Sequence, residues 1–155
     1  MSEPGTPTAL SEATFRQLAE LRYRIRQFVH FSEVTAREHG LEPQQHQLLL
    51  AIKGLPERVK PTVRSLSERM CLRHHSTVEL VNRLAERGAV MRRPSEHDRR
   101  EVLLELTPLG ERLLSELSVL HWDELQVSGP ALAQAIQQML ERAPCASEAA
   151  GRFSI

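Results

Sequence analysis

The sequence predicts a mainly α-helical fold with a small β-wing, and three observations support this fold class. Hydrophobic residues make up 41% of the 155 residues but aromatic residues only 4%, so leucine and alanine dominate and strand formers are few. Apolar residues recur at helical spacing along most of the chain. After Gly88 the period changes, and residues 90–93 and 101–107 have the pattern of two paired strands.

The first part of the chain is organised by residues that begin or end helices. Residues 1–10, with two prolines and a glycine, are expected to form a disordered arm. Ser11 or Thr14 can cap a long helix that runs to about residue 39, and Gly40 ends it. Pro43 suits the first turn of a second helix, which ends near Gly54. The loop that follows is expected to include a short strand near residues 58–59.

Residues 63–107 predict two short helices, a turn and a hairpin. Thr62 can cap the first of these helices. Gly88 ends the second, whose apolar face is formed by Val78, Val81, Leu84 and Ala85. Between the strands lies a polar tip at residues 94–100, which opens with proline. This order of elements is typical of a winged helix-turn-helix domain, here over about residues 55–107, whose second helix enters the DNA major groove.

The last part of the chain predicts further helices. Thr107-Pro108 can start one, Ser128-Gly129-Pro130 is expected to break it, and a final helix is expected to end near residue 143. Residues 144–155 would form a tail.

The terminal helices, about residues 11–39 and 108–143, carry leucine-rich stripes that a winged domain alone does not need. Such stripes usually pack against a partner. A second copy of the chain would give a two-fold dimer that holds two DNA-reading domains about one DNA turn apart. We therefore expect a single domain over residues 11–143, in which N- and C-terminal dimerisation helices flank the winged helix-turn-helix.

The charge distribution supports a DNA-binding centre. The formal net charge of the chain is zero, but residues 58–100 hold eleven Lys and Arg against five Asp and Glu. DNA affinity depends on this local excess because it neutralises phosphates where the protein touches them. The alternative is a solvated basic surface without a ligand.

Several classes of protein are disfavoured. Cys71 and Cys145 form neither a disulfide framework nor a zinc motif. No apolar run approaches the ~18 residues of a membrane span, and residues 1–10 lack the features of a signal peptide, so a cytoplasmic protein without membrane association is expected. The sequence contains no phosphate-binding glycine loop and no His-Glu-x-x-His, which argues against an enzyme.

The end of the hairpin resembles the multiple-antibiotic-resistance regulator (MarR) family of winged helix-turn-helix repressors. The resemblance covers residues 12–143 and is carried by D-x-R at Asp98–Arg100, by L-T-x-x-G at Leu106–Gly110, by the helix end at residues 84–90 and by Leu48-Leu49. It implies an obligate dimer that binds near-palindromic double-stranded DNA, as repressor or activator, and that is released or tuned by a ligand or an oxidant.

Candidate DNA contacts follow from the domain type and from the resemblance. Base contacts are expected near the start of the second helix, at Arg73, His74, His75, Ser76 and Glu79. Relatives often have arginine where Glu79 stands, so the base preference of this chain is expected to differ. Phosphate contacts are expected from Arg64, Arg69, Arg83, Arg92 and Arg93. By the resemblance, Arg100 would insert into the minor groove and Asp98 would hold its guanidinium, with Arg99 solvated or facing phosphate.

The resemblance also implies an effector pocket between the dimerisation helices and the DNA-reading domain. It would be lined by Tyr23, Arg26, His30, His46, His121 and Trp122, which would suit a small aromatic or anionic effector. The alternative is a packed interface that takes no ligand.

No cofactor or metal is expected. Adjacent His74 and His75 point to different sides of a helix, and a zinc site from His30, His39 and His121 would lack any His-x-x-x-His pair. Cys71 is expected to be a small buried residue, which disfavours oxidation sensing.

The function expected is that of a homodimeric, sequence-specific transcriptional regulator, most simply a repressor. The alternatives are a non-specific architectural DNA binder and a helical protein-interaction module.

Overall fold

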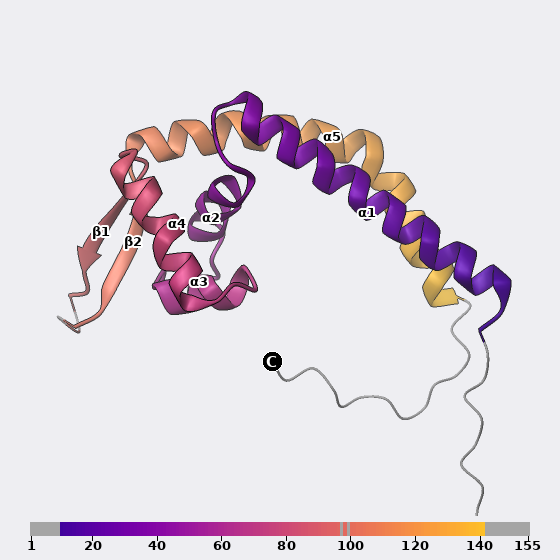
Figure 1. Cartoon of the computed structure of the whole chain (residues 1–155), viewed down its shortest axis with the longest axis horizontal. Coiled ribbons are helices and arrows are strands. Elements are labelled where there is room, and N and C mark those ends of the chain that lie inside the picture. Colours follow the sequence, from indigo (N-terminus) through magenta and orange to yellow (C-terminus); the bar gives the residue numbers. More distant parts are fainter. Residues whose placement is uncertain (1–9, 97, 99, 142–155) are drawn as a thin grey trace, which may run out of the picture. The chain divides into compact units, whose positions relative to one another are not determined.

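The computed structural model describes residues 10–96, 98 and 100–141, which form five helices and one two-stranded sheet (Figure 1). The described chain divides into two compact units. One comprises residues 10–29 with residues 124–141, and the other comprises His30–Asp123. Except for Leu10, the expected arm at residues 1–10 and the expected tail at residues 144–155 lie outside the described residues.

The two long helices begin at the residues that the sequence indicated. Helix α1 spans Glu12–Glu38, and the hydroxyl of Ser11 accepts a hydrogen bond from the Thr14 N–H at 3.2 Å, so Ser11 is the cap. Gly40 follows α1 with a φ of +72°, a left-handed conformation that glycine adopts without strain. Helix α5 spans Pro108–Glu141, and the Thr107 hydroxyl accepts from the Gly110 N–H at 3.2 Å.

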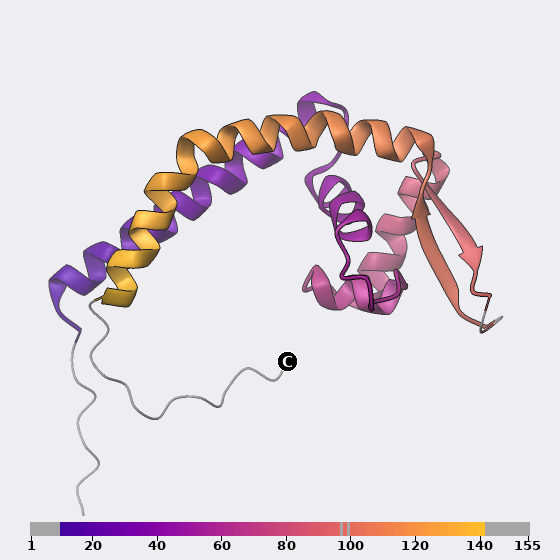
Figure 2. The same ribbon diagram turned by 180° about the vertical axis from the view of Figure 1, so that it is seen from behind.

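Helix α5 continues through Pro130, so the prediction of a break at Ser128–Pro130 was wrong. A proline inside a helix removes one N–H from the ladder, and its ring crowds the carbonyl four residues earlier. The Ser128 hydroxyl donates to the Glu124 carbonyl at 3.0 Å. Residues 124–141 lie alongside residues 10–29 of α1 in both ribbon views (Figures 1 and 2). Tertiary packing of this kind routinely overrides the preference of a single residue.

Three shorter helices form the centre of the His30–Asp123 unit. They are α2 (Pro43–Lys53), α3 (Val63–Arg69) and α4 (His74–Glu86). Pro43 occupies the first position of α2, and the Thr62 hydroxyl caps α3 by accepting from the Ser65 N–H at 3.2 Å. Gly88 follows α4 with a φ of +76°. These helix boundaries are confirmed.

Strands β1 (Val90–Pro94) and β2 (Val102–Leu106) form the antiparallel hairpin that the sequence predicted. Val90 pairs with Leu106 and Arg92 with Leu104. The expected strand near residues 58–59 is wrong, because this segment is a turn in which the Val59 N–H donates to the Pro56 carbonyl at 2.8 Å. The loop instead joins the sheet at Pro61, whose carbonyl accepts from the Leu104 N–H at 2.8 Å.

The core of the His30–Asp123 unit is made of aliphatic side chains, mostly leucine, from every helix and from the hairpin. Its fully buried members include Leu48, Leu49, Leu66, Val81, Leu84, Leu104 and Leu117. The buried face of α4 differs slightly from the expected one: Thr77 and Leu80 are buried, whereas Val78 and Ala85 are half-buried. Burial of Thr77 is possible because its hydroxyl donates to the Arg73 carbonyl at 3.3 Å.

In the part of the chain that the structure describes, no helix is both long enough and apolar enough to span a membrane.

Candidate nucleic-acid interface

Helix α4 presents one continuous polar stripe to solvent. Because Thr77, Leu80, Val81 and Leu84 are buried, residues on the opposite side of the helix face outward. These are His75, Glu79, Asn82 and Glu86, at spacings of four, three and four, and all are exposed. The stripe therefore has the geometry of a helix face that can enter a major groove.

The residues at the start of α4 are also accessible. Arg73 is the N-cap residue, and it is exposed together with His74, while Ser76 is half-buried. All five predicted base-contacting residues therefore lie on or beside the first two turns of α4, with only Ser76 partly covered. The contacts themselves stay a prediction.

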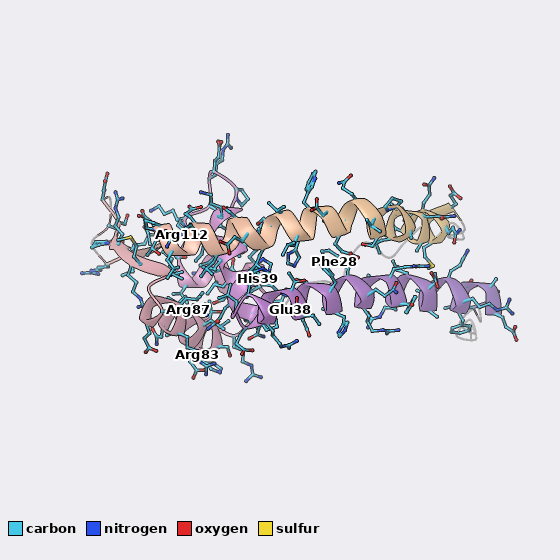
Figure 3. The ribbon with its side chains drawn as sticks, turned by 90° about the horizontal axis from the view of Figure 1, so that it is seen from above. Phe28, Glu38, His39, Arg83, Arg87 and Arg112 are labelled. Carbon is cyan, nitrogen blue, oxygen red and sulfur yellow. The ribbon has the colours of Figure 1, made fainter. Side chains whose placement is uncertain are left out.

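Five of the predicted DNA-contacting arginines make no ion pair within the described residues: Arg69, Arg73, Arg83, Arg92 and Arg100. Figure 3 labels Arg83 on the outer side of the α4 ribbon. Arg64 pairs with Glu68 at 3.3 Å, one helical turn away. Both of these side chains are largely exposed, so the pair is weak and Arg64 can exchange it for a phosphate.

The turn between α3 and α4 places Cys71 in an unexpected environment. Cys71 is exposed and has a φ of +53°, in the left-handed region. The expectation of a small buried residue was wrong because the helix-turn-helix bend has to reverse the chain at this position. Leu72, which follows it, packs against the core in its place.

The hairpin arginines are held by neighbouring side chains. The guanidinium of Arg92 donates to Oδ1 of Asn82 at 2.5 Å, which joins β1 to the outward stripe of α4. Arg93 donates to Glu105 at 3.3 Å and to Glu96 at 3.0 Å. Two carboxylates therefore reduce the attraction of Arg93 for a phosphate.

At the hairpin tip, Asp98 holds the backbone rather than the guanidinium of Arg100. Its carboxylate accepts from the Arg100 N–H at 2.9 Å, and its carbonyl accepts from the Glu101 N–H at 2.9 Å. The residue spacing allowed a side-chain pair, but the short carboxylate reaches the nearby amide in this turn. Arg100 is exposed at the tip. Arg99 lies outside the described residues.

The domain that carries the helix and hairpin is braced at several points. Lys60 bonds Glu101 at 2.6 Å beside the hairpin, and the Thr107 hydroxyl donates to the Gly88 carbonyl at 2.6 Å. The guanidinium of Arg87, labelled in Figure 3, donates to the Gly40 carbonyl and so joins the end of α4 to the end of α1.

Two of the predicted effector-binding residues, His46 and His121, lie in contact. Their ring centroids are 4.6 Å apart, and Phe31 meets the ring of His121 edge-on. Nδ1 of His121 donates to the Leu117 carbonyl, so in the neutral ring Nε2 accepts from the Ser32 hydroxyl at 2.7 Å.

His46 is buried, and neither ring nitrogen has a hydrogen-bond partner within the described residues. Burial, and then the positive charge that His121 can carry, lower the pKa of His46 to about 4.

The other four predicted effector-binding residues are divided between the two units. His30 and Trp122 are exposed in the same unit, and Tyr23 and Arg26 belong to the unit of residues 10–29 and 124–141. Across residues 10–96, 98 and 100–141, no group of three or more His, Cys, Asp or Glu side chains could hold a metal ion.

Two residues of the interface were missed as sites by reasoning from the sequence. Asn82 belongs to the outward stripe, and the spacing from His75 and Glu79 was a signal that could have identified it. Arg87 was missed because its partner, Gly40, lies 47 residues earlier. No local pattern marks such a contact.

Comparison with known proteins shows which proteins the chain is similar to. A model of the MarR family matches residues 39–101 of the chain. A MarR family protein from Bacillus stearothermophilus is 26% identical with a TM-score of 0.64, covering 85% of this chain and 99% of that one.

Two further solved structures share the fold. CouR from Rhodococcus jostii RHA1, bound to p-coumaroyl-CoA, is 24% identical with a TM-score of 0.57, covering 86% and 85% of the two chains. A mutant of S. aureus MepR bound to an oligodeoxyribonucleotide is 12% identical with a TM-score of 0.59, covering 88% and 100%. No curated protein sequence matches the chain.

Proposed function

We propose that this chain is a member of the MarR family of winged helix-turn-helix transcriptional regulators and that it represses transcription by binding a near-palindromic operator as a homodimer. Family membership makes it a DNA-binding regulator and not an enzyme, in agreement with the sequence analysis. The repressor role, the symmetry of the operator and the homodimer belong to the proposal.

The observation that carries the proposal is the pairing of an outward polar stripe on α4 with an exposed arginine on the adjoining hairpin. His75, Glu79 and Asn82 can meet base edges in a major groove, and Arg100 can enter the neighbouring minor groove. Arg69, Arg73 and Arg83, which have no carboxylate partner within the described residues, can neutralise phosphates. This combination supports recognition of a defined sequence.

The exposed apolar residues of α1 and α5 support a second copy of the same chain as partner. Val127, Leu140, Trp122, Val119 and Phe15 are 79%, 72%, 66%, 61% and 58% exposed. Large apolar side chains that stay accessible in one chain usually mark an interaction surface. A homodimer buries such surfaces in pairs and gives DNA binding a two-fold axis.

A small-molecule effector is the further part of the proposal. The structure of CouR holds p-coumaroyl-CoA, which supports a ligand in a protein of this fold. In this chain the buried His46, whose ring nitrogens have no partner within the described residues, offers polar groups beside the ring of His121, which Phe31 meets edge-on. An effector of small aromatic or anionic character fits these groups.

The experiment is a selection of bound duplexes from a random DNA library with the purified protein, read out by sequencing. We expect an inverted repeat whose half-sites are centred about 10 bp apart. Recovery of sequence-blind duplexes would instead support an architectural DNA binder. Recovery of no duplex would support a protein-interaction module.

A further inference from the structure

We infer that Asn82 reads a base edge in the major groove and that Arg92 of the hairpin sets which side of the Asn82 amide faces the base. The inference rests on the proposed function and deepens it. It assigns a specificity-determining residue to α4 and a positioning residue to β1, and it specifies the chemical class of base edge that is read.

Asn82 lies where a base contact requires it to lie. It is exposed on the outward stripe of α4, seven residues after His75 and three after Glu79. Seven residues span about 10 Å of helix, the length of about three stacked base pairs. Asn82 therefore extends the stripe that begins at the expected base-contacting residues by one more turn, on the same side of the helix.

The hydrogen bond from Arg92 fixes the orientation of the amide. An asparagine amide has an oxygen that accepts and an NH₂ group that donates, and the two ends have almost the same shape. A guanidinium has only donors. The end of the Asn82 amide that faces Arg92, at 2.5 Å, must therefore be the oxygen. The NH₂ group is then left to face away from Arg92.

This orientation changes what Asn82 can recognise. A free asparagine commonly binds adenine with both ends of its amide, because its oxygen accepts from N6 and its NH₂ donates to N7. With the oxygen engaged by Arg92, the NH₂ group is the end left to meet the base. Its two hydrogens match both acceptors of guanine, N7 and O6, and the acceptor O4 of thymine. Adenine offers the acceptor N7 beside an N6 donor that the NH₂ group cannot satisfy, and cytosine offers only the N4 donor.

The position of Arg92 is itself set by the hairpin. Arg92 lies on the same face of β1 as Val90, which is buried, and it pairs with Leu104, which is buried on β2. The core therefore anchors the backbone on both sides of this contact. Arg93 projects from the opposite face of the strand, where it bonds Glu105 and Glu96, so it cannot replace Arg92.

The test repeats the duplex selection with the full chain and four variants. Asn82→Ala removes the amide, Arg92→Ala releases it, and Arg92→Lys keeps a donor beside the oxygen. Arg93→Ala is the matched control, because it removes one positive charge from the neighbouring position on the other face. Both residues of the contact are exposed, so the variants are expected to fold, and circular dichroism verifies this.

For the unchanged chain we expect one position in each half-site at which guanine or thymine is preferred over adenine by about tenfold. Asn82→Ala loses this preference at that position only. Arg92→Ala moves it toward adenine, because the free amide can then bind adenine with both ends. Arg92→Lys and Arg93→Ala keep the original preference at that position.

Two results overturn the inference while the proposed function stands. If Asn82→Ala selects the same motif as the unchanged chain, Asn82 does not read a base. If Asn82→Ala loses a preference that Arg92→Ala leaves unaltered, Arg92 does not orient the amide. Failure of the unchanged chain to select any motif contradicts the proposed function itself, and the inference with it.

Discussion

At Gly110 the addition of a single Cβ atom would cause a steric clash with the backbone. It lies in the first turn of α5, where a Cβ would come 2.1 Å from the backbone oxygen of Ala89. Gly129 lies in the same helix and has open space around it. The two glycines therefore separate the effect of packing from the effect of helix propensity.

We expect Gly110→Ala to lower the free energy of unfolding by about 1–3 kcal/mol, because the backbone at Ala89 or the start of α5 has to move. Gly129→Ala is expected to raise it by about 0.5–1 kcal/mol through helix propensity. Urea denaturation of both variants gives these values. Equal effects of the two substitutions would contradict the close packing at Gly110.

His46 gives the protein a dependence on pH. Its pKa is lowered to about 4 from the ordinary histidine value of about 6.5, first by burial and then by His121. A lowered histidine pKa means that the unfolded chain binds more protons between these two values. The stability from neutral, buried His46 is thus complete above pH ~6.5 and declines as pH falls toward 4.

From pH 7.5 to pH 5 the free energy of unfolding is expected to fall by about 2 kcal/mol through His46. His46→Phe, which cannot be protonated, should remove most of that fall. Urea midpoints measured at the two pH values for both proteins test this. An identical pH dependence in the variant would assign the effect to other groups.

Arg100 is the residue on which minor-groove contact depends in this account. Arg100→Ala is expected to weaken operator binding about ten- to a hundredfold without changing the melting temperature, because the residue is exposed at the hairpin tip. Arg112→Ala, in the second turn of α5 (Figure 3), is the control for loss of one positive charge. Anisotropy titration of a labelled operator compares them, and equal losses would argue against the minor-groove assignment.

At the scale of elements, the exposed faces of α1 and α5 are the surfaces expected to join two chains. Leu117 belongs to the leucine-rich stripe that the sequence predicted for the C-terminal helix, but it is wholly buried in its own chain and so cannot serve this purpose. Phe15 and Leu140 are exposed. They are therefore better positions at which to test the interface.

The double variant Phe15→Asp with Leu140→Asp is expected to sediment as a monomer at concentrations where the unchanged chain is a dimer, since paired carboxylates cannot be buried cheaply. The far-ultraviolet circular dichroism spectrum of the double variant should show the same helix content as that of the unchanged chain. Leu117→Asp is the contrasting variant and is expected to unfold the chain. A dimeric double variant would place the interface elsewhere.

The elements that the sequence predicted are those defined by local chemistry. Thr62, Pro43 and Gly88 act on the backbone within a few residues of themselves, so their effect is visible in the sequence. The break expected at Pro130 failed because packing of the surrounding helix outweighs one missing N–H.

The parts of the site that the sequence did not predict depend on residues that are distant along the chain. Asn82 meets Arg92 ten residues away, and Arg87 meets Gly40 across 47 residues. Cys71 was expected to be buried from its residue type, whereas the helix-turn-helix bend places it in solvent. Such arrangements are set by the fold as a whole.

At the scale of the whole molecule, DNA binding is explained by where the charges lie along the chain and not by the net charge. The chain has a formal net charge of zero, yet the eleven basic residues between positions 58 and 100 outnumber the acidic ones there by six. One such domain reaches only one half-site. Two of them, held by the terminal helices, would have to meet the same face of the DNA at a fixed separation.

The most direct measurement of this central claim is the affinity for the selected operator with about 5 bp inserted between its half-sites, which rotates one half-site by about half a turn. A dimer with two linked domains then loses the base contacts of one half-site. Each lost base-pair contact weakens the free energy of binding by ~1–3 kcal/mol, so the affinity should fall by at least about a hundredfold. Unchanged affinity after the insertion would mean that each chain binds its half-site alone, and would contradict the account.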